Sequence, residues 1–161
     1  MREKIRFVAQ SAMIAALYVI LTYLANLLGI ASGVIQVRFS EALTILPYFT
    51  AAAIPGLYIG CLLANFLTGA AFWDIIFGSL ATLIGAMLTY LLRKKDEKLA
   101  PIPPILSNTI IIPPILKIVY GVPDAMPFLY LTVFIGEVIS CGILGLIFLY
   151  AIQKHKSKVF D

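Results

Sequence analysis

The chain has 161 residues, of which 61% are hydrophobic and only 12% are charged. Soluble globular domains use roughly 45–50% apolar residues, so the composition excludes an ordinary soluble protein and indicates an integral membrane protein. A chain of this length accommodates about six spans of about 20 residues each and leaves no room for a separate soluble enzyme domain. We therefore predict one all-α transmembrane domain covering residues 1–161.

Six apolar segments are separated by turn or charge signals. They are Arg6–Leu28, Arg38–Ala53, Gly56–Phe72, Ile75–Leu92, Ala100–Val119 and Met126–Gln153. Each segment is continuously apolar rather than alternating, which predicts transmembrane helices and not β-barrel strands. The first segment is longer than the apolar core of a signal peptide, so we expect an uncleaved span. The second is the weakest prediction, because it is short and contains Pro47.

The orientation follows from the basic residues, which stay on the cytoplasmic side of short segments. They form three clusters, namely Arg2, Lys4 and Arg6, then Arg93, Lys94, Lys95 and Lys98, and finally Lys154, Lys156 and Lys158. Even numbers of predicted spans separate these clusters, so all three fall on one side. We expect a multi-pass protein of the plasma membrane with both termini cytoplasmic.

Six further charges lie in or beside the apolar segments: Arg38, Glu41, Asp74, Lys117, Asp124 and Glu137. An ionisable group inside a membrane costs roughly 2.5–3.5 kcal/mol even on insertion scales, so such groups usually face the bundle interior and mark a site. Five of the six map to the predicted outer ends of spans. Glu137 lies about 11 residues into the last segment, near mid-membrane. The chain therefore predicts a polar, net acidic site in the outer half of the bundle.

Several of these residues have alternative structural roles. Arg38 and Glu41 are three positions apart, so they form either a surface ion pair or a pair that a ligand separates. Trp73 is either an interfacial anchor or a stacking surface for a ligand, and Asp74 either caps the next helix or contacts a ligand. Glu137 has no such simple alternative, because a mid-span carboxylate must be protonated, paired or bound to a ligand.

The other candidates favour structural explanations. Lys117 can extend to the membrane interface, and Asp124 fits a solvated turn. Cys61 and Cys141 lack a CxxC spacing or histidine neighbours, so we expect buried thiols and neither a disulfide nor a metal site. The chain contains no P-loop, HExxH or GxSxG sequence, so we expect no ATP binding by this chain and no enzyme activity.

The sequence resembles the QueT family of queuosine-precursor transporters, which are substrate-binding S-components of energy-coupling factor (ECF) transporters. The resemblance is densest in QVRFSEALTILP at 36–47, AIPGLYIGCLLAN at 53–65 and WDIIFGSLATL at 73–83. It extends to Ser107 and Asn108 in the fifth segment and to Glu137 in the sixth, and so covers essentially the whole chain.

The resemblance implies a six-helix bundle with a ligand site open to the outside. It also implies two kinds of partner, a membrane coupling subunit and two cytoplasmic ATPases, which agrees with the missing P-loop. Ala12 and Ala16 match the alanine stripe with which such helices pack on the coupling subunit, although Ser11 and Ala15 form a second small-residue pattern beside it. We also expect contact with the lipid bilayer. We expect no cofactor in this chain and no nucleic-acid partner.

The implied ligand is a 7-deazaguanine precursor of queuosine. The resemblance implies that Glu41 or Glu137 accepts from the purine edge, that Asp74 binds an exocyclic amine and that Trp73 stacks on the base. Asn65 and Asn108 would contact the carbonyl or ring nitrogens, and Arg38 would act as a gate or as the partner of Glu41. An S-component for another vitamin or purine remains the alternative, followed by an intramembrane enzyme or an assembly subunit.

Overall fold

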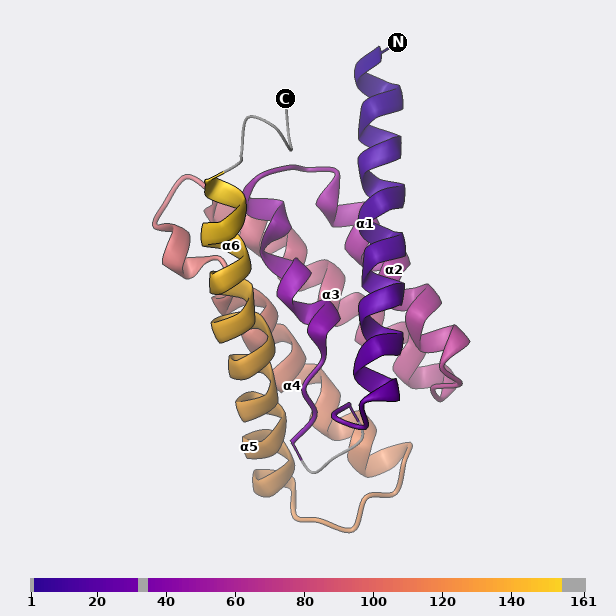
Figure 1. Ribbon diagram of the computed structural model, residues 1–161. Coiled ribbons are helices and arrows are strands. Elements are labelled where there is room, and N and C mark those ends of the chain that lie inside the picture. Colours follow the sequence, from indigo (N-terminus) through magenta and orange to yellow (C-terminus); the bar gives the residue numbers. More distant parts are fainter. Residues whose placement is uncertain (1, 32–34, 155–161) are drawn as a thin grey trace.

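A computed structural model describes residues 2–31 and 35–154, which form nine helical segments (Figure 1). They are α1 (Arg2–Leu27), the 3₁₀ helix η1 (Phe39–Tyr48), α2 (Ala53–Leu67), α3 (Phe72–Leu92), the 3₁₀ turn η2 (Glu97–Leu99), α4 (Ile102–Ile118), α5 (Met126–Glu137), the π-helix η3 (Val138–Leu144) and α6 (Gly145–Gln153). The predicted all-helical class is confirmed. Lys156 and Lys158 of the third basic cluster lie outside the described residues.

Four helices of the described chain are long and apolar enough to cross a membrane. They are α1, α3, the unit Glu97–Ile118 and the unit Met126–Gln153, in which α5, η3 and α6 follow one another without a break. The fifth apolar helix, α2, has only 15 residues. It ends at Leu67 because Gly69 adopts the left-handed conformation (φ 76°) typical of a residue just past a helix C-terminus, earlier than the predicted end at Phe72. The chain is thus a multi-pass membrane protein.

The predicted second span, Arg38–Ala53, is wrong in both length and type. In its place stands η1, a 3₁₀ helix of 10 residues, which at about 2.0 Å per residue covers about 20 Å of the roughly 30 Å hydrocarbon core. Pro47 lies inside it, where the proline ring cannot donate a backbone hydrogen bond. Because η1 contacts α1, α2, α3, η3 and α6, it is enclosed by protein instead of facing lipid (Figure 1).

Helices α1 and α2 pack with their backbones close together. A Cβ atom added to Gly60 would lie 2.8 Å from the Tyr18 Cβ and 3.0 Å from the Ala15 Cα, so no larger residue fits without a shift. The Ser11 hydroxyl donates to the Ala52 carbonyl oxygen at 2.9 Å across the same interface. Ser11 and Ala15 therefore form the face that packs inside the bundle.

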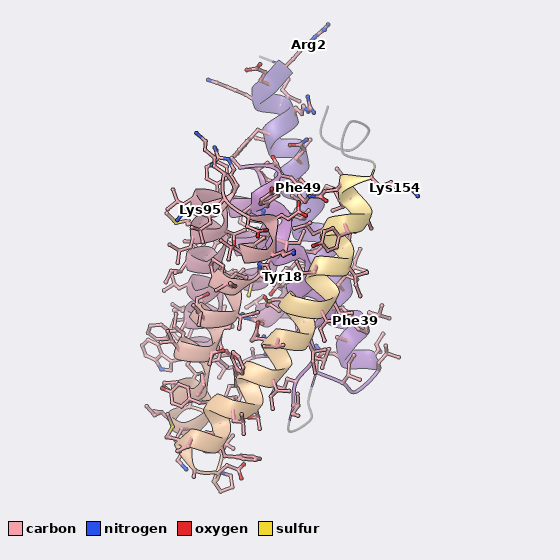
Figure 2. The ribbon with its side chains drawn as sticks, turned by 90° about the vertical axis from the view of Figure 1, so that its left-hand side faces the viewer. Arg2, Tyr18, Phe39, Phe49, Lys95 and Lys154 are labelled. Atoms are coloured by element: carbon pink, nitrogen blue, oxygen red, sulfur yellow. The ribbon has the colours of Figure 1, made fainter. Side chains whose placement is uncertain are left out.

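The two ends of the bundle carry different features. The first turn of α1 and the last turn of α6 lie at one end, whereas the α2–α3 turn and the α4–α5 loop lie at the other (Figure 1). Arg2, Lys95 and Lys154, one from each basic cluster, all lie toward the first end (Figure 2). We call the opposite end, with the α2–α3 turn and the α4–α5 loop, the loop end.

Candidate functional site

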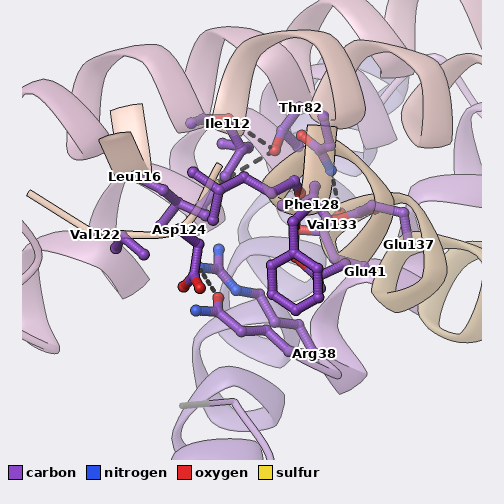
Figure 3. A pocket seen from close by; sticks show the side chains of 16 residues that line it. Arg38, Glu41, Thr82, Ile112, Leu116, Val122, Asp124, Phe128, Val133 and Glu137 are labelled. Atoms are coloured by element: carbon purple, nitrogen blue, oxygen red, sulfur yellow. Dashed lines mark hydrogen bonds between the residues drawn. The ribbon is translucent and has the colours of Figure 1, made fainter. Parts of the chain in front are cut away.

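A cavity of about 310 Å³ lies between the loop preceding η1, the first turn of η1, and helices α3, α4 and α5 (Figure 3). This volume falls at the lower end of the roughly 300–1,000 Å³ range of small-molecule sites. We call it the inner cavity. Its polar lining residues are Gln36, Arg38, Glu41, Cys61, Thr82, Asn108, Asp124, Thr132 and Glu137, and its apolar lining includes Ile112, Leu116, Phe128, Leu129 and Val133.

Glu41 lies on the first turn of η1 and is almost completely buried, with 2% of its surface exposed. The Tyr18 hydroxyl of α1 donates a hydrogen bond to one carboxylate oxygen of Glu41. The Asn108 amide of α4 donates to the other oxygen at 3.5 Å. Both oxygens of Glu41 thus have protein partners from two other helices, which fixes the orientation of the carboxylate.

Glu137 is the last residue of α5 and is half-buried because it faces the inner cavity. The Cys141 thiol, one turn later in η3, donates to its Oε2 at 3.1 Å. Asn108 lies between the two carboxylates and interacts with both. Short π-helical segments within α-helices are frequent at functional sites, and here the segment begins directly after Glu137.

Glu41, Glu137 and Cys141 place carboxylate oxygens and a sulfur atom within 4.8 Å of one another. Such a group has enough ligand atoms to raise the question of a metal site. However, both oxygens of Glu41 already accept hydrogen bonds, and the Cys141 thiol donates one, so these atoms act as hydrogen-bonding groups. The arrangement suits a ligand with N–H donors better than a metal ion.

Arg38 precedes η1 and its side chain borders the inner cavity. Its backbone N–H donates to the Ser140 hydroxyl of η3 at 3.1 Å, and its guanidinium donates to the Gln36 amide oxygen at 3.4 Å. Within the described chain, Arg38 and Glu41 do not form an ion pair within 4.0 Å, so the surface pair considered from the sequence is not present. Both side chains instead line one cavity.

A second cavity, of about 770 Å³, lies at the loop end beside the first, and we call it the outer cavity. Gln36, Arg38, Leu116 and Val122 border both cavities. Arg38 therefore stands at the boundary between the two, which is where a gating residue would have to lie.

Asn65, Asp74 and Tyr120 line the outer cavity and are absent from the lining of the inner one. Asp74 does not provide a side-chain cap for α3, but accepts a hydrogen bond at 2.8 Å from the Tyr120 hydroxyl, which itself accepts one at 3.0 Å from the Ala71 N–H. Burial raises the pKa of the Tyr120 phenol, and the hydrogen bond to Asp74 raises it further. The hydroxyl therefore stays protonated at neutral pH and holds the α2–α3 turn against the end of α4.

Trp73 lies outside both cavities. Its side chain is 53% exposed and stacks on Phe77, with ring centroids 5.9 Å apart and an interplanar angle of 24°. Together with Ile111, Pro114 and Ile118 it borders a separate apolar depression. The structure does not bring Trp73 together with the other candidate residues, and its stacking role stays a prediction.

Sequence reasoning missed several residues of the inner cavity. It also missed Tyr18, which does not line the cavity but donates to Glu41; the usable signal was that a tyrosine in the middle of an apolar helix requires a partner for its hydroxyl. Asp124 was assigned to a solvated turn, yet it lines the inner cavity. Thr82 and Phe128 gave no signal that would separate them from the other apolar-segment residues. The fifth predicted segment contributes Asn108 on α4 to the cavity lining.

The small-residue patterns on α1 separate into two faces. Ser11 and Ala15 are buried against α2, whereas Ala12 and Ala16 are exposed. The bundle thus leaves Ala12 and Ala16 available for contact with lipid or with another protein.

An apolar helical bundle that spans a membrane several times and encloses a polar cavity of ligand size is the architecture of a membrane transport protein. The chain belongs to the QueT transporter family, whose model matches residues 8–154. It is also similar to the protein named queuosine precursor transporter QueT from Lactococcus lactis subsp. cremoris (strain MG1363), with 43% identity over 89 residues. That match covers 53% of this chain and 52% of the relative, so the chain spans about half the length of the curated relative it matches. No solved structure matches it significantly. The family is one of transporters and not of enzymes, as the motif analysis led us to expect.

Proposed function

We propose that this chain is the membrane-embedded substrate-binding subunit for a queuosine precursor of the 7-deazaguanine type. The single observation that carries the proposal is the inner cavity, in which two carboxylates and an amide from three different helices converge. A guanine-like edge has adjacent N–H donors and a carbonyl oxygen, and these need carboxylate and amide partners. The name of the Lactococcus relative agrees with this ligand class.

Within the cavity, Glu137 is our choice for the purine N–H edge. Both oxygens of Glu41 are occupied by Tyr18 and Asn108, so Glu41 serves to orient Asn108 and to shape the floor. Asn108 would contact the carbonyl or a ring nitrogen. Stacking on an aromatic ring is worth roughly 1–3 kcal/mol per base, and Phe128 is the aromatic residue that lines this cavity.

The outer cavity would be the entrance. Asp74 and Asn65 would contact the ligand on its way in, and Arg38, which borders both cavities, would separate the two compartments. The loop end would face outside, because the three basic clusters lie toward the other end and basic residues favour the cytoplasmic side. Both termini would then be cytoplasmic, and η1 and α2 would complete six membrane-embedded helical regions of one domain.

Uptake would depend on partners. We propose that a membrane coupling subunit and two cytoplasmic ATPases supply the driving force, since the chain carries no P-loop. The exposed pair Ala12 and Ala16 offers a surface of small side chains on which a partner helix can approach closely. Energy coupling would then reach the cavity through α1, because Tyr18 of that helix holds Glu41.

Calorimetric titration of the purified, detergent-solubilised protein with 7-deazaguanine precursors tests the proposal. We expect saturable binding of one deazaguanine ligand per chain, and weaker binding of guanosine. Mass spectrometry of ligand that co-purifies with the protein provides a second readout. If no deazaguanine binds and a vitamin or a different purine co-purifies, that compound would replace deazaguanine as the proposed ligand. Chemical conversion of a ligand by the isolated chain would favour an enzyme.

A further inference from the structure

Asp124 lies on the loop between α4 and α5, at the mouth of the inner cavity. Its side chain is exposed, and it borders the inner cavity but not the outer one. Figure 3 shows its carboxylate directed toward the Arg38 guanidinium and away from the floor formed by Glu41 and Glu137. Asp124 thus places a third carboxylate on this cavity, at the end opposite the first two.

Lys117 fixes the backbone that carries Asp124. Its ammonium group donates to three successive main-chain oxygens, those of Val122 and Pro123 at 3.1 Å each and that of Asp124 at 2.9 Å. A lysine ammonium has three N–H donors, so this clasp uses all of them on the backbone. The Val122 N–H also donates to the Leu116 carbonyl oxygen at 3.1 Å. The loop is therefore tied to the end of α4, and the Asp124 carboxylate receives no hydrogen bond from Lys117.

The formal charges around the inner cavity do not balance. Among the described residues that line it, Arg38 is the one basic side chain, against the three carboxylates of Glu41, Asp124 and Glu137. No ion pair within 4.0 Å joins Arg38 to any of these carboxylates in the described chain. A cleft with an excess of formal charge of one sign, and with low-dielectric walls, favours ligands of the opposite charge. The cavity is thus suited to a ligand that carries a positive group.

The orientation of the ligand decides where this positive group lies. Under the proposed function, the N–H edge of the six-membered ring contacts Glu137 at the floor. A substituent on the five-membered ring lies on the far side of the fused ring system and so points to the mouth. Asp124 is the carboxylate at that position.

We infer that Asp124 is a substrate-specificity residue, which binds the primary ammonium on the side arm of an aminomethyl-deazaguanine and so distinguishes this ligand from its neutral nitrile counterpart. Lys117 is a positioning residue that acts through Asp124. This inference rests on the proposed function for the location of the base. It adds a side-arm contact by a residue that lines the inner cavity, whereas Asp74 lines the outer one.

The test compares two ligands on purified protein by calorimetry, 7-aminomethyl-7-deazaguanine and 7-cyano-7-deazaguanine. We expect Asp124→Asn to weaken binding of the amine by at least about tenfold, because hydrogen bonds to charged groups are the strong ones, and to change binding of the nitrile by less than about twofold. Asp124→Glu should retain part of the preference. Lys117→Met should also lower the affinity for the amine relative to that for the nitrile, but by less than Asp124→Asn does. Circular dichroism should show that the fold of this variant is intact.

Glu3→Gln is the matched control, because it removes one exposed carboxylate from the first turn of α1, at the end of the bundle far from the loop end. It should leave both affinities unchanged. Equal losses for the two ligands in Asp124→Asn, or no loss for either, would overturn the inference while leaving the proposed function in place. Failure of the unmodified protein to bind either deazaguanine would overturn the proposed function and the inference with it.

Discussion

Replacing Glu137 by glutamine should weaken ligand binding strongly without unfolding the protein. Glu137 faces the inner cavity, and one of its oxygens accepts from the Cys141 thiol at 3.1 Å. In Glu137→Gln the amide oxygen can keep that bond, which turns the NH₂ group toward the cavity. An N–H donor of the ligand would then meet a donor of the protein, and the negative charge would be lost.

The size of the effect follows from this geometry. A hydrogen bond to a charged group contributes about 1.5–3 kcal/mol, which corresponds to a loss of affinity of about 10- to 150-fold. Stability should not fall, because the substitution removes a charge from a half-buried site and the amide oxygen can keep the bond from Cys141. Calorimetric titration measures the affinity, and thermal unfolding followed by circular dichroism measures the stability.

Glu41→Gln is the informative comparison. The Tyr18 hydroxyl and the Asn108 amide both donate to Glu41, so one of these donors would face the new NH₂ group. An unsatisfied buried donor costs about 1–3 kcal/mol, so this variant should lose stability. If Glu137→Gln binds like the unmodified protein while a folded Glu41→Gln does not bind, the assignment of the two carboxylates is reversed.

Three further changes test other parts of the site. Phe128→Ala should weaken binding by about 1–3 kcal/mol if its ring stacks on the base, and Trp73→Ala should not; the opposite result in the same titrations would restore the stacking role to the tryptophan. Tyr120→Phe removes the hydroxyl that holds the α2–α3 turn, so proteolysis at that turn should become faster, and unchanged cleavage would show that the bond does not restrain it. Ala12→Trp and Ala16→Trp should prevent co-purification with the coupling subunit while leaving ligand affinity unchanged, and a stable complex with both variants would exclude this face as the interface.

The apolar segments of the sequence locate the helices well, because removing backbone polar groups from water requires internal hydrogen bonding wherever the chain enters lipid. The same pattern cannot show which helices reach across the membrane. Pro47 and the short length made the second segment the weakest prediction, and its 3₁₀ geometry depends on the five helical elements that surround η1. The early end of α2 depends on the left-handed backbone of Gly69, which the sequence indicates only as a glycine.

The charged residues of the sequence indicated several residues of the cavity lining but gave an incomplete list of its members. Arg38, Glu41 and Glu137 meet there because buried charges need polar surroundings, and no apolar helix face provides them. Trp73 illustrates the limit of this reasoning. In a helix that is apolar on all sides, nothing in the sequence fixes which side faces the interior, so an aromatic residue cannot be assigned to the cavity or to the lipid face.

The two carboxylates of the cavity floor lie in or directly beside the irregular helices of the bundle. Glu41 is on the first turn of the 3₁₀ helix η1, and Glu137 immediately precedes the π-helix η3. The two irregular helices contact each other, and the Arg38 N–H joins the start of one to Ser140 of the other. In contrast to the regular helices around them, both have backbone hydrogen bonds shifted from the α-helical register. The spacing between Glu41 and Glu137 therefore depends on how η1 and η3 pack against each other.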